Sequence, residues 1–502
     1  MEYLLDNAQM READEYTIKT LGVPSLVLME RAGEALADRV QALAPQGEIL
    51  CVCGGGNNGG DGFVCARLLH GRGYKVSTVC VGENKSAERA KNYQKYLTLC
   101  GEVLSEFPQK KYAVVVDCLL GTGFTGELRA KYAEAVERIN AYKADGATVL
   151  SADIPSGVQA NGRVKTVAVQ ADETLCIGEL KTGVFLNDGI DYAGKISRED
   201  IGIELPRGKE EYARITSRGE IAKLLPKRKR NTHKGSYGKA AIVGGSIEYT
   251  GAAYLAVAAC LRAGAGYTAL FTPKGVLPYY MLKAPEALLI ASNEGDRYEF
   301  NPKKAQELLS YNTVAYGMGM GTSIAVAEGA LWLLSNYTGK LILDADALNS
   351  FAFFGREKLA KAFEQKKCDV VLTPHIKEFA RLLDKKVEQV LEDGITLAKA
   401  FAEKYRVTVL LKNAVSVVTD GARVAVNTTG TAGQAKGGSG DMLAGVLAGL
   451  CAQGLSVFDG AKASAYLCGK AGEIATERVG EYSLVATDTV NALGEAFLSL
   501  YE

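Results

Sequence analysis

The run Cys53-Gly54-Gly55-Gly56-Asn57-Asn58-Gly59-Gly60-Asp61-Gly62 decides the fold of the first half of this chain. The apolar residues Ile49–Val52 before it predict a buried strand, and the apolar spacing from Phe63 to Leu69 after it predicts an amphipathic helix. Glycines between a strand and a helix let successive N–H groups point at an anion near the helix N-terminus. The glycine spacing matches the dinucleotide-binding fingerprint, which is weak alone, whereas Asn-Asn-Gly-Gly-Asp is far more specific. The run therefore predicts a phosphate-binding turn.

The first half alternates strand and helix patterns. Strands are expected at Ile49–Val52, Val76–Val81, Ala113–Asp117, Thr148–Ser151 and Glu173–Ile177. Helices are expected at Asp6–Leu21, Pro24–Leu43, Asp61–Leu69, Ala87–Cys100 and Ala130–Tyr142. This alternation predicts an α/β fold with a mostly parallel sheet and helices on both faces.

Length and composition exclude several classes of protein. A chain of 502 residues is long enough for two or three domains. Lys plus Arg and Asp plus Glu both number 58, so neither a nucleic acid nor a membrane surface is an expected partner. The 11 cysteines are scattered singly and only 3 histidines are present, which favours free thiols in a reducing compartment over disulfides or a zinc site. With no signal peptide and no apolar run of about 18 residues, a cytoplasmic enzyme is expected.

Composition shifts near Lys209–Ser217, so a boundary is predicted there, with domains 1–216 and 217–502. The basic segment Pro226–Gly235 follows, and the sequence leaves open whether it is a solvated linker or a loop that faces a ligand. A second α/β unit begins at Lys239–Gly245. Its further strands are expected at Tyr267–Phe271, Thr313–Tyr316, Leu341–Asp344, Val370–Leu372, Val409–Leu411 and Ala414–Thr419.

Two more loops of the first half follow strands that end in an acid. Asp117 leads into Gly121–Glu127, and Asp153 leads into Ile154-Pro155-Ser156-Gly157. Because parallel strands end at one edge of a sheet, these loops and the glycine run predict a cleft with phosphate-binding N–H groups and two or three carboxylates. Alone, either Asp more often caps a turn, and Asp61 alone more often stabilises a helix N-terminus.

These three motifs together resemble the NAD(P)H-hydrate epimerases, which interconvert the R and S hydrates of NADH and NADPH. The resemblance covers residues 1–216 and implies a Rossmann-like three-layer domain. It implies that the hydrate is bound by Asn57, Asn58, Gly59, Gly60, Asp61, Gly121, Thr122, Gly123, Phe124, Thr125, Gly126, Glu127, Tyr132 and Asp153. It also implies potassium on Asn58, Asp117 and Ser156, whose oxygen donors suit a hard cation. Asp153 is the expected acid–base group.

The second half carries Gly437-Gly438-Ser439-Gly440-Asp441 before an apolar helical pattern. N–H groups at such a helix start form an anion hole, and an Asp beside it can take a proton from a hydroxyl during phosphoryl transfer. The structural alternative is that Asp441 only caps the N-terminus of a helix after a flexible turn. Gly-x-Gly-Asp marks the phosphoryl-transfer centre of ribokinase-like folds.

Together with Asp344-Ala345-Asp346, Thr373-Pro374-His375 and Lys412–Ser416, this motif resembles the ADP- or ATP-dependent NAD(P)H-hydrate dehydratases over residues 220–500. The resemblance implies a ribokinase-like domain with Asp441 as catalytic base. It implies a hydrate site of Ala253, Gly319, His375 and Asp441, and an ADP site of Lys412, Asn413, Ala414, Val415, Ser416 and Gly440. ADP and magnesium are the expected cofactors, and a homo-oligomer is expected. Ile376-Lys377 stands where the family has Pro-Gly, and the loss of this rigid turn predicts a small shift of His375.

Two other functions stay open at this point. The C-terminal half could be a small-molecule alcohol kinase that releases a stable phosphate ester, because such kinases share Gly-x-Gly-Asp. The N-terminal half could be a non-catalytic nucleotide sensor or RNA-associated scaffold. The presence of Asp153 and Asp441 argues against a sensor, and the balanced charge argues against RNA.

Overall fold

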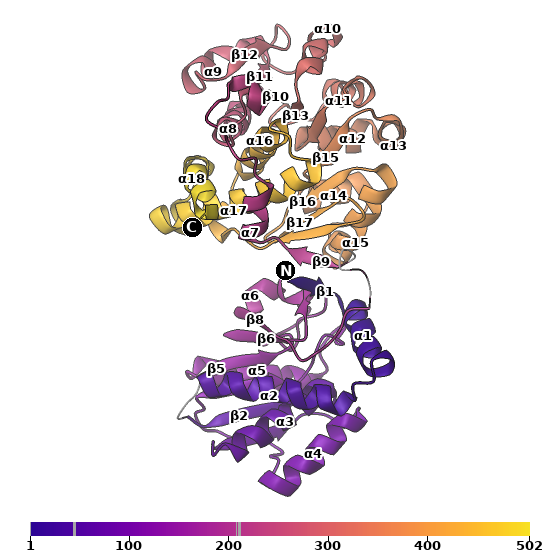
Figure 1. Ribbon diagram of the computed structural model, residues 1–502, viewed down its shortest axis with the longest axis vertical. Helices are drawn as coiled ribbons and strands as arrows, with labels where there is room; N and C mark the ends of the chain where they lie inside the picture. Colours follow the sequence, from indigo (N-terminus) through magenta and orange to yellow (C-terminus); the bar gives the residue numbers. More distant parts are fainter. Residues whose placement is uncertain (1, 44–46, 207, 209–211, 502) are drawn as a thin grey trace. The chain divides into compact units, whose positions relative to one another are not determined.

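The structure is a computed structural model that describes residues 2–43, 47–206, 208 and 212–501 (Figure 1). The chain divides into two compact units, Glu2–Ala213 and Arg214–Glu502. The segment 209–217, where the composition changes, lies partly outside the described residues. Each unit is an α/β domain with its own sheet.

The N-terminal unit alternates strands and helices as its sequence predicts. Its elements are β1 (Tyr3–Leu5), α1 (Asn7–Glu15), α2 (Ser25–Leu43), β2 (Ile49–Cys53), α3 (Asn57–Gly71), β3 (Val76–Cys80), α4 (Ala87–Cys100), β4 (Val114–Cys118), α5 (Ala130–Ala144), β5 (Thr148–Ala152), β6 (Glu173–Ile177), β7 (Leu180–Lys181), α6 (Gly189–Tyr192) and β8 (Lys195–Glu199). The helix expected over Asp6–Leu21 ends its α-helical part at Glu15 and continues as a π-helical turn over Tyr16–Thr20.

Six parallel strands form the main sheet of this unit, in the order β3-β2-β4-β5-β6-β8. Alternate residues of β2 point to opposite faces, so Ile49 and Cys51 pack with α2, α3 and α4, whereas Leu50 and Val52 pack with α5. The strand order changes direction between β2 and β4. In open α/β sheets, such a switch point is where ligands bind.

The C-terminal unit also alternates strands and helices, and it includes helices longer than those of the N-terminal unit. Its elements are β9 (Ala213–Ile215), α7 (Arg218–Leu224), β10 (Lys239–Val243), α8 (Thr250–Arg262), β11 (Tyr267–Thr272), α9 (Leu277–Lys283), β12 (Leu288–Ala291), α10 (Pro302–Ala305), β13 (Thr313–Tyr316), α11 (Ile324–Asn336), β14 (Lys340–Leu343), α12 (Asp346–Phe354), α13 (Arg356–Gln365), β15 (Asp369–Leu372), α14 (Ile376–Leu383), α15 (Val387–Tyr405), β16 (Thr408–Leu411), β17 (Ser416–Thr419), β18 (Val424–Asn427), α16 (Ser439–Ala452), α17 (Val457–Ser483) and α18 (Ala486–Leu498).

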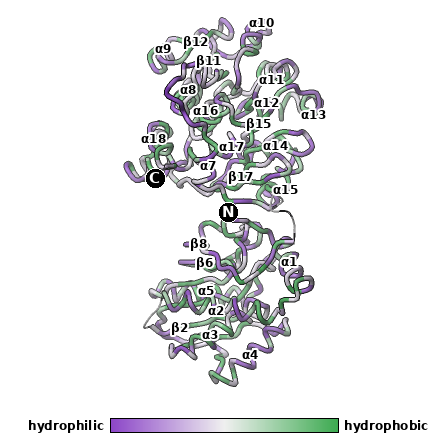
Figure 2. Tube along the Cα trace, viewed as in Figure 1, coloured by the Kyte–Doolittle hydropathy of each residue, from purple (hydrophilic) through white to green (hydrophobic). Residues whose placement is uncertain are grey.

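The sheet of this unit has the order β12-β11-β10-β13-β14-β15-β16-β17-β18-β9. The strands are parallel from β12 to β16, and β17 is antiparallel to both of its neighbours. Helices α8, α16, α17 and α18 pack on one face against Ile242, and α11 to α15 pack on the other against Val243. Apolar and polar residues alternate along many of the covering helices (Figure 2), as expected for helices with one buried face.

Most predicted strands differ from the structure by one or two residues at one end or both, and two of these differences fall beside site residues. The strand expected at Ala414–Thr419 begins at Ser416, because residues 413–415 bend to reverse the chain between β16 and β17. The strand expected to end at Asp344 ends at Leu343, because the chain turns sharply at Ala345, which has φ +48°. Both differences place functional candidates in turns.

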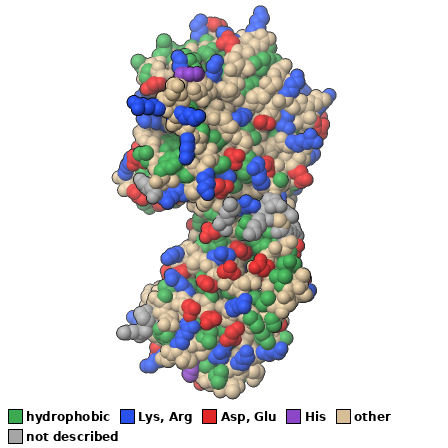
Figure 3. All heavy atoms as spheres, viewed as in Figure 1, with side chains coloured by type: hydrophobic (Ala, Val, Ile, Leu, Met, Phe, Trp, Pro, Cys, Tyr) green, Lys and Arg blue, Asp and Glu red, His purple; other side chains and the backbone are tan. Residues whose placement is uncertain are grey.

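The basic segment Pro226–Gly235 lies exposed on the surface, and Figure 3 shows many Lys and Arg side chains on the visible face of this unit. The guanidinium of Arg228 donates hydrogen bonds to the Gly264 carbonyl and to Gln453, and it stacks on Tyr237 at 4.0 Å. Among the described helices, none combines the length and apolar composition that a membrane span requires.

Candidate active sites

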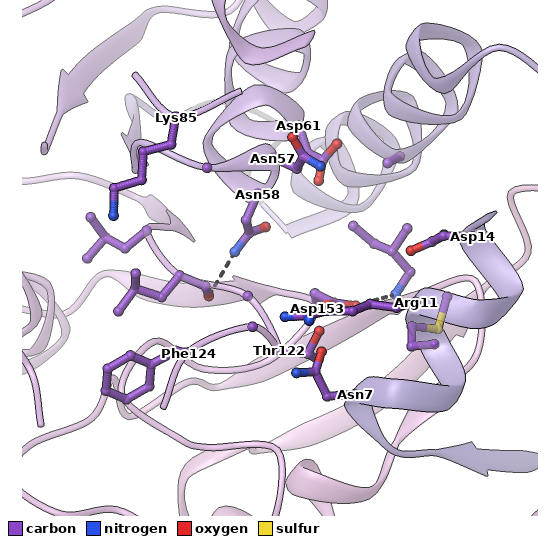
Figure 4. A pocket seen from close by; sticks show the side chains of 18 of the residues that line it. Asn7, Arg11, Asp14, Asn57, Asn58, Asp61, Lys85, Thr122, Phe124 and Asp153 are labelled. Atoms are coloured by element: carbon purple, nitrogen blue, oxygen red, sulfur yellow. Dashed lines mark hydrogen bonds between the residues drawn. The ribbon is translucent and has the colours of Figure 1, made fainter. Parts of the chain in front are cut away.

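A cavity of about 660 Å³ opens at the carboxyl ends of β2, β4 and β5 (Figure 4). Its walls are the loops after these strands, the start of α3, and helix α1. The switch point of the sheet therefore carries a cavity. Most residues expected to bind the hydrate line it: Asn57, Asn58, Asp61, Gly121, Thr122, Gly123, Phe124, Thr125, Glu127, Tyr132 and Asp153.

Three of the predicted glycines do not line this cavity. A Cβ on Gly59 would lie 2.0 Å from the Gly54 carbonyl oxygen, and one on Gly60 would lie 2.6 Å from Met29 Sδ. These two glycines allow α3 to pack closely against the β2 turn and α2. Gly126 has φ +86° and its N–H donates to Gln159, so it shapes the loop.

The three residues expected to bind potassium meet beside the cavity. Asp117 is fully buried and accepts four hydrogen bonds, from the N–H groups of Leu119 and Ser156 and from the hydroxyls of Ser151 and Ser156. The Asn58 Nδ2 donates to the carbonyls of Leu120 and Ala152, at 2.9 and 3.3 Å. The Asn58 Oδ1 is buried without a hydrogen-bond partner among the described residues. A buried oxygen without a partner is costly unless a ligand satisfies it.

Asp153 follows β5 directly and has an unusual backbone. Its φ of +71° lies in the left-handed region, which a non-glycine residue adopts at a cost. Oδ1 pairs with Lys181 Nζ at 2.5 Å and accepts the Ile177 N–H at 3.4 Å. Oδ2 lies 3.8 Å from the position that a Cβ on Gly121 would occupy, so it faces the cavity loop. One oxygen of the carboxylate is anchored, and the other is turned toward the cavity.

Helix α1 and strand β7 supply cavity residues that the sequence analysis missed. Asn7, Arg11 and Asp14 lie on one face of α1 because their spacing matches a helical repeat. Figure 4 shows Arg11 and Asp14 reaching toward Asp153 from this helix. Lys181 also lines the cavity although only 2% of its side chain is exposed. The spacing of Asn7, Arg11 and Asp14 could have indicated a polar face of this helix, but no sequence pattern predicts the two-residue strand β7.

The charges of this cavity influence one another. Burial raises the pKa of Asp14 to about 6, although Lys181 opposes the shift. Burial, and then the carboxylates of Asp153 and Asp14, raise the pKa of Asp61 well above its usual range. The carboxyls of Asp14, Asp61 and Asp153 therefore all interact with the charge of the buried Lys181.

A second cluster lies at the carboxyl ends of the parallel strands of the C-terminal unit. Lys412 follows β16, and its Nζ pairs at 2.7 Å with Asp344 Oδ1, which follows β14. A Cβ on Gly440 would lie 3.1 Å from the same Nζ, so the glycine-rich turn before α16 meets this ion pair. The structure thus brings together residues from three of the predicted motifs.

The predicted hydrate-binding residues of this unit come from neighbouring loops. Ala253 on α8 packs beside the turn after β10. A Cβ added to Gly245 in this turn would lie 3.2 Å from the Cβ of Ala253. A Cβ on Gly319 would lie 2.8 Å from Tyr249 and Ala252, next to that turn. The N–H of Gly321 in the same loop donates to Asp346 at 2.8 Å.

His375 forms the N-cap of α14. Its Nδ1 accepts the N–H groups of Lys377 and Glu378, and the Glu378 carboxylate accepts the His375 N–H at 2.8 Å. Burial, and then Lys412, lower the pKa of His375, which favours the neutral ring that such a cap requires. Helix α14 begins directly at Ile376, so the departure from Pro-Gly leaves the turn closed by a capping box.

Asp441 lies in the first turn of α16, after Gly438, which has φ +97°. Burial, and then Asp344, raise the pKa of Asp441 to about 7. Glu378 shares this environment, since burial raises its pKa to about 7 while Lys412 opposes the shift. Burial alone would lower the pKa of Lys412, but Asp344 and Glu378 together hold it above its usual value. Asp441 is therefore poised to exchange a proton near neutral pH.

Comparison with known proteins gives consistent matches for both units. A model of the NAD(P)H-hydrate dehydratase family matches residues 240–493, and a model of the YjeF-related protein N-terminus matches residues 25–183. The bifunctional NAD(P)H-hydrate repair enzyme Nnr of Thermofilum pendens is 34% identical, covering 99% of this chain and 96% of that protein. The enzyme of the same name from Moorella thermoacetica is 33% identical, covering 100% and 97%.

Solved structures match the C-terminal unit. A hypothetical protein from Streptococcus mutans has a TM-score of 0.50 and 23% identity, covering 57% of this chain and 100% of its own. The ADP/ATP-dependent NAD(P)H-hydrate dehydratase from Bacillus subtilis, co-crystallised with ATP and Mg²⁺, has a TM-score of 0.49 and 26% identity, covering 57% and 98%.

The fold and the two sites define a two-domain α/β enzyme with a Rossmann-like N-terminal domain and a ribokinase-like C-terminal domain, so the predicted fold class is confirmed. The chain belongs to the family of bifunctional NAD(P)H-hydrate repair enzymes, which confirms the predicted family. The dehydratase match decides against the alcohol-kinase alternative for the C-terminal half, and the full-length match to bifunctional repair enzymes argues against the sensor alternative for the N-terminal half.

Proposed function

We propose that the two units divide the repair of hydrated NADH and NADPH between them. The cavity of the N-terminal unit interconverts the R and S hydrates. The site around Asp441 dehydrates the S hydrate and converts ADP to AMP and phosphate. The observation that carries this division is that each unit has its own Asp beside N–H-rich loops at a sheet edge, Asp153 in one and Asp441 in the other.

In the N-terminal cavity, the N–H groups of the loops from Asn57 to Asp61 and from Gly121 to Glu127 bind the phosphates of the hydrate. Tyr132 lies against the Gly82 turn and lines the same cavity. Asp153 contacts the hydrated nicotinamide ring through Oδ2, which is turned toward the cavity loop while Oδ1 stays on Lys181. A carboxylate held in this way can transfer a proton at the C6 centre without moving its backbone.

Potassium fits the residues beside this cavity. No described residue hydrogen-bonds the Asn58 Oδ1, and the Leu120 and Ala152 carbonyls converge on the same amide. Asp117 supplies a buried negative charge and Ser156 a hydroxyl oxygen. An oxygen-only donor set suits a hard cation, so Asn58, Asp117 and Ser156 would hold potassium. When bound, it would offset the buried carboxylate and fix the loops. Replacing potassium with sodium should then slow epimerisation and leave dehydration of the S hydrate unchanged.

In the C-terminal site, Asp441 takes the proton of the C6 hydroxyl while that oxygen accepts a phosphoryl group from ADP. Phosphate then leaves with the electrons of the C6–O bond, C5 loses a proton, and the ring double bond is restored. The turn Gly437–Gly440 presents N–H groups at the start of α16, where they stabilise the phosphate charge. Ala253, Gly319 and His375 line the hydrate side of this site.

The nucleotide binds through Lys412–Ser416 and Gly440. Lys412 is a half-buried cation of the site, and a Cβ on Gly440 would crowd it. Magnesium fits as a partner of the nucleotide phosphates, because Mg²⁺ keeps several water ligands and binds proteins through one or two carboxylates. Asp344 and Asp346 offer such carboxylates at the end of β14.

The assignment of the two sites is tested with Asp153→Ala in the full chain. Interconversion of purified R hydrate, measured by chromatography without nucleotide, should fall by about 100-fold or more. Dehydration of purified S hydrate with ADP should stay at the rate of the unmodified chain. An equal loss of both activities would contradict the division of labour. The expected homo-oligomer stays a prediction that light scattering can measure.

A further inference from the structure

Four ionisable side chains from four elements line the N-terminal cavity together. Asp14 comes from α1, Asp61 from α3, Asp153 from the end of β5 and Lys181 from β7. Arg11, also on α1, is the other charged residue of that helix in the cavity wall. The proposed function uses Asp153 alone as the proton-transfer group, so the roles of Asp14 and Lys181 remain to be explained.

Strand pairing holds Lys181 and Asp14 in place. β1 pairs in parallel with β7, which sets Leu5 opposite Lys181. Helix α1 begins two residues after Leu5 and is closed by a capping box between Asp6 and Gln9. Met10 and Ala13 pack in a small core with Leu5 and Tyr212, which fixes α1 in place, and Asp14 lines the cavity one turn after Met10.

Lys181 is committed to Asp153. Its ammonium group pairs with Asp153 Oδ1 at 2.5 Å and also donates to the Ile177 carbonyl. The Lys181 side chain is 2% exposed and that of Asp153 is 18% exposed, so the lysine holds Asp153 from the buried side. Oδ1 is thereby fixed, while Oδ2 stays turned toward the cavity loop.

Asp14 is in a different state. Among the described residues, no side chain or N–H group forms a hydrogen bond or ion pair with its carboxyl. Burial raises its pKa to about 6, Lys181 lowers it, and Asp153 raises it. Asp14 and Asp153 therefore line one cavity in different surroundings, one held by a lysine and the other without such a partner among the described residues, and two carboxyls in different surroundings can act as an acid and a base.

We propose that Asp14 is the second proton-transfer group of the epimerase, acting with Asp153, and that Lys181 is a positioning residue that holds the Asp153 carboxyl in place. This inference rests on the proposed assignment of the cavity as the epimerase site. It adds a catalytic residue and a positioning residue to the single Asp that the sequence motifs indicate.

Inversion at C6 gives both carboxyls a task. The acid donates its proton to the C6 hydroxyl as the C6–O bond breaks, water leaves, and the N1 electron pair forms an N1=C6 double bond. A water molecule then adds to C6 from the other face and loses a proton to the carboxylate. One proton is donated and one is taken up, so the sum is balanced. The two carboxyls have exchanged roles for the reverse reaction.

The test uses the full chain with Asp14→Asn, Lys181→Met and Lys181→Arg. Glu15→Gln is the matched control, because Glu15 lies on the same helix, is 64% exposed and pairs only with Lys19 in the structure. Interconversion of R and S hydrates is followed by chromatography without nucleotide. Dehydration of purified S hydrate by the same preparation reports whether the chain is folded.

Asp14→Asn should lower the kcat of epimerisation by about 100-fold with little change in KM. The fall in rate as pH rises through about 6, where Asp14 loses its proton, should disappear. Lys181→Met should move that fall to higher pH, because Lys181 lowers the pKa of Asp14, and Lys181→Arg should restore much of the rate.

Unchanged kcat and pH dependence in Asp14→Asn, with an active unmodified chain, would overturn this inference and leave the proposed function standing. An unmodified chain that does not epimerise the hydrate would overturn the proposed function and this inference with it. If Lys181→Met matched the unmodified chain at every pH, the positioning role of Lys181 would be wrong.

Discussion

The N-terminal and C-terminal sites both place one lysine among several carboxyls, but the lysine has a different partner in each. In the N-terminal cavity, Lys181 pairs with Asp153, the proposed proton-transfer group. In the C-terminal site, Lys412 pairs with Asp344, a neighbour of the proposed base Asp441. Burial then raises the pKa of Asp441 to about 7.

This difference suits the two reactions. An epimerase must donate a proton on one face of a carbon and accept one on the other, so it needs two carboxyls in opposite states. A phosphoryl-transfer site needs one base near neutrality and a cation for the phosphates. The lysine therefore holds one of the two proposed proton-transfer groups in the N-terminal site, whereas in the C-terminal site it holds a neighbour of the proposed base.

The largest expected effect separates the two sites. Asp441→Asn removes the proposed base and should lower ADP-dependent dehydration of S hydrate by about 1,000-fold or more. Interconversion of R and S hydrates should stay at the unmodified rate. Glu364→Gln, which removes an exposed carboxylate from α13, should change neither activity. Loss of both activities in Asp441→Asn would show that the sites are not independent.

Replacing either of two glycines in the first motif with alanine should destabilise the N-terminal unit to different degrees. A Cβ at position 54 would lie 1.8 Å from the Leu119 carbonyl oxygen, whereas a Cβ at position 56 meets no atom within 4 Å. Gly54→Ala should therefore destabilise the N-terminal unit by about 3 kcal/mol and reduce epimerisation, while Gly56→Ala should cost less than about 1 kcal/mol. Calorimetric unfolding of both variants measures this. Equal destabilisation would contradict the close approach of the two loops.

The pH dependence of dehydration should reveal the neighbour of the base. Asp441 must be ionised to accept a proton, so the rate should rise with pH and level off above about 7. Asp344 raises the pKa of Asp441, so Asp344→Asn should move this rise to lower pH. The measurement is kcat against pH with saturating ADP and S hydrate. If kcat of Asp344→Asn rises over the same pH range as in the unmodified chain, Asp344 does not influence the pKa of Asp441.

The smallest expected effect concerns stability. Because folding raises the pKa of Asp441 above its ordinary value of 3.8 to about 7, the folded unit binds the proton more tightly. Its stability is therefore lost as pH rises between these two values. Asp441→Asn carries no charge and should raise the unfolding midpoint by a few degrees at about pH 8, with a smaller gain at about pH 5. A gain that does not depend on pH would contradict the raised pKa.

The sequence was sufficient for the α/β class, for most strands, and for the loops that carry glycines and acids. Those loops can be predicted because a strand, a tight turn and a helix leave a local pattern, as around Asp61 and Asp441. The sites also depend on contacts that are distant in the chain. Lys181 reaches Asp153 from β7, and Lys412 meets Asp344 across neighbouring parallel strands.

Turns and caps account for the other differences. His375 was expected to contact the hydrate, and the structure adds that it caps α14 together with Glu378. The strand after β16 was predicted to begin at Ala414, but the bend at residues 413–415 delays it to Ser416. Such details depend on hydrogen bonds of single turns, which hydrophobic periodicity does not report.

The central claim is that two independent sites act in sequence on one substrate pool. The most direct test adds the full chain, magnesium, potassium and ADP to a mixture of R and S hydrates of NADH, and follows the near-ultraviolet absorbance of reduced nicotinamide. If both sites are active, the whole mixture is recovered as NADH. Recovery that stops at the S fraction would contradict the epimerase site, and no recovery with ADP or ATP would contradict the dehydratase site.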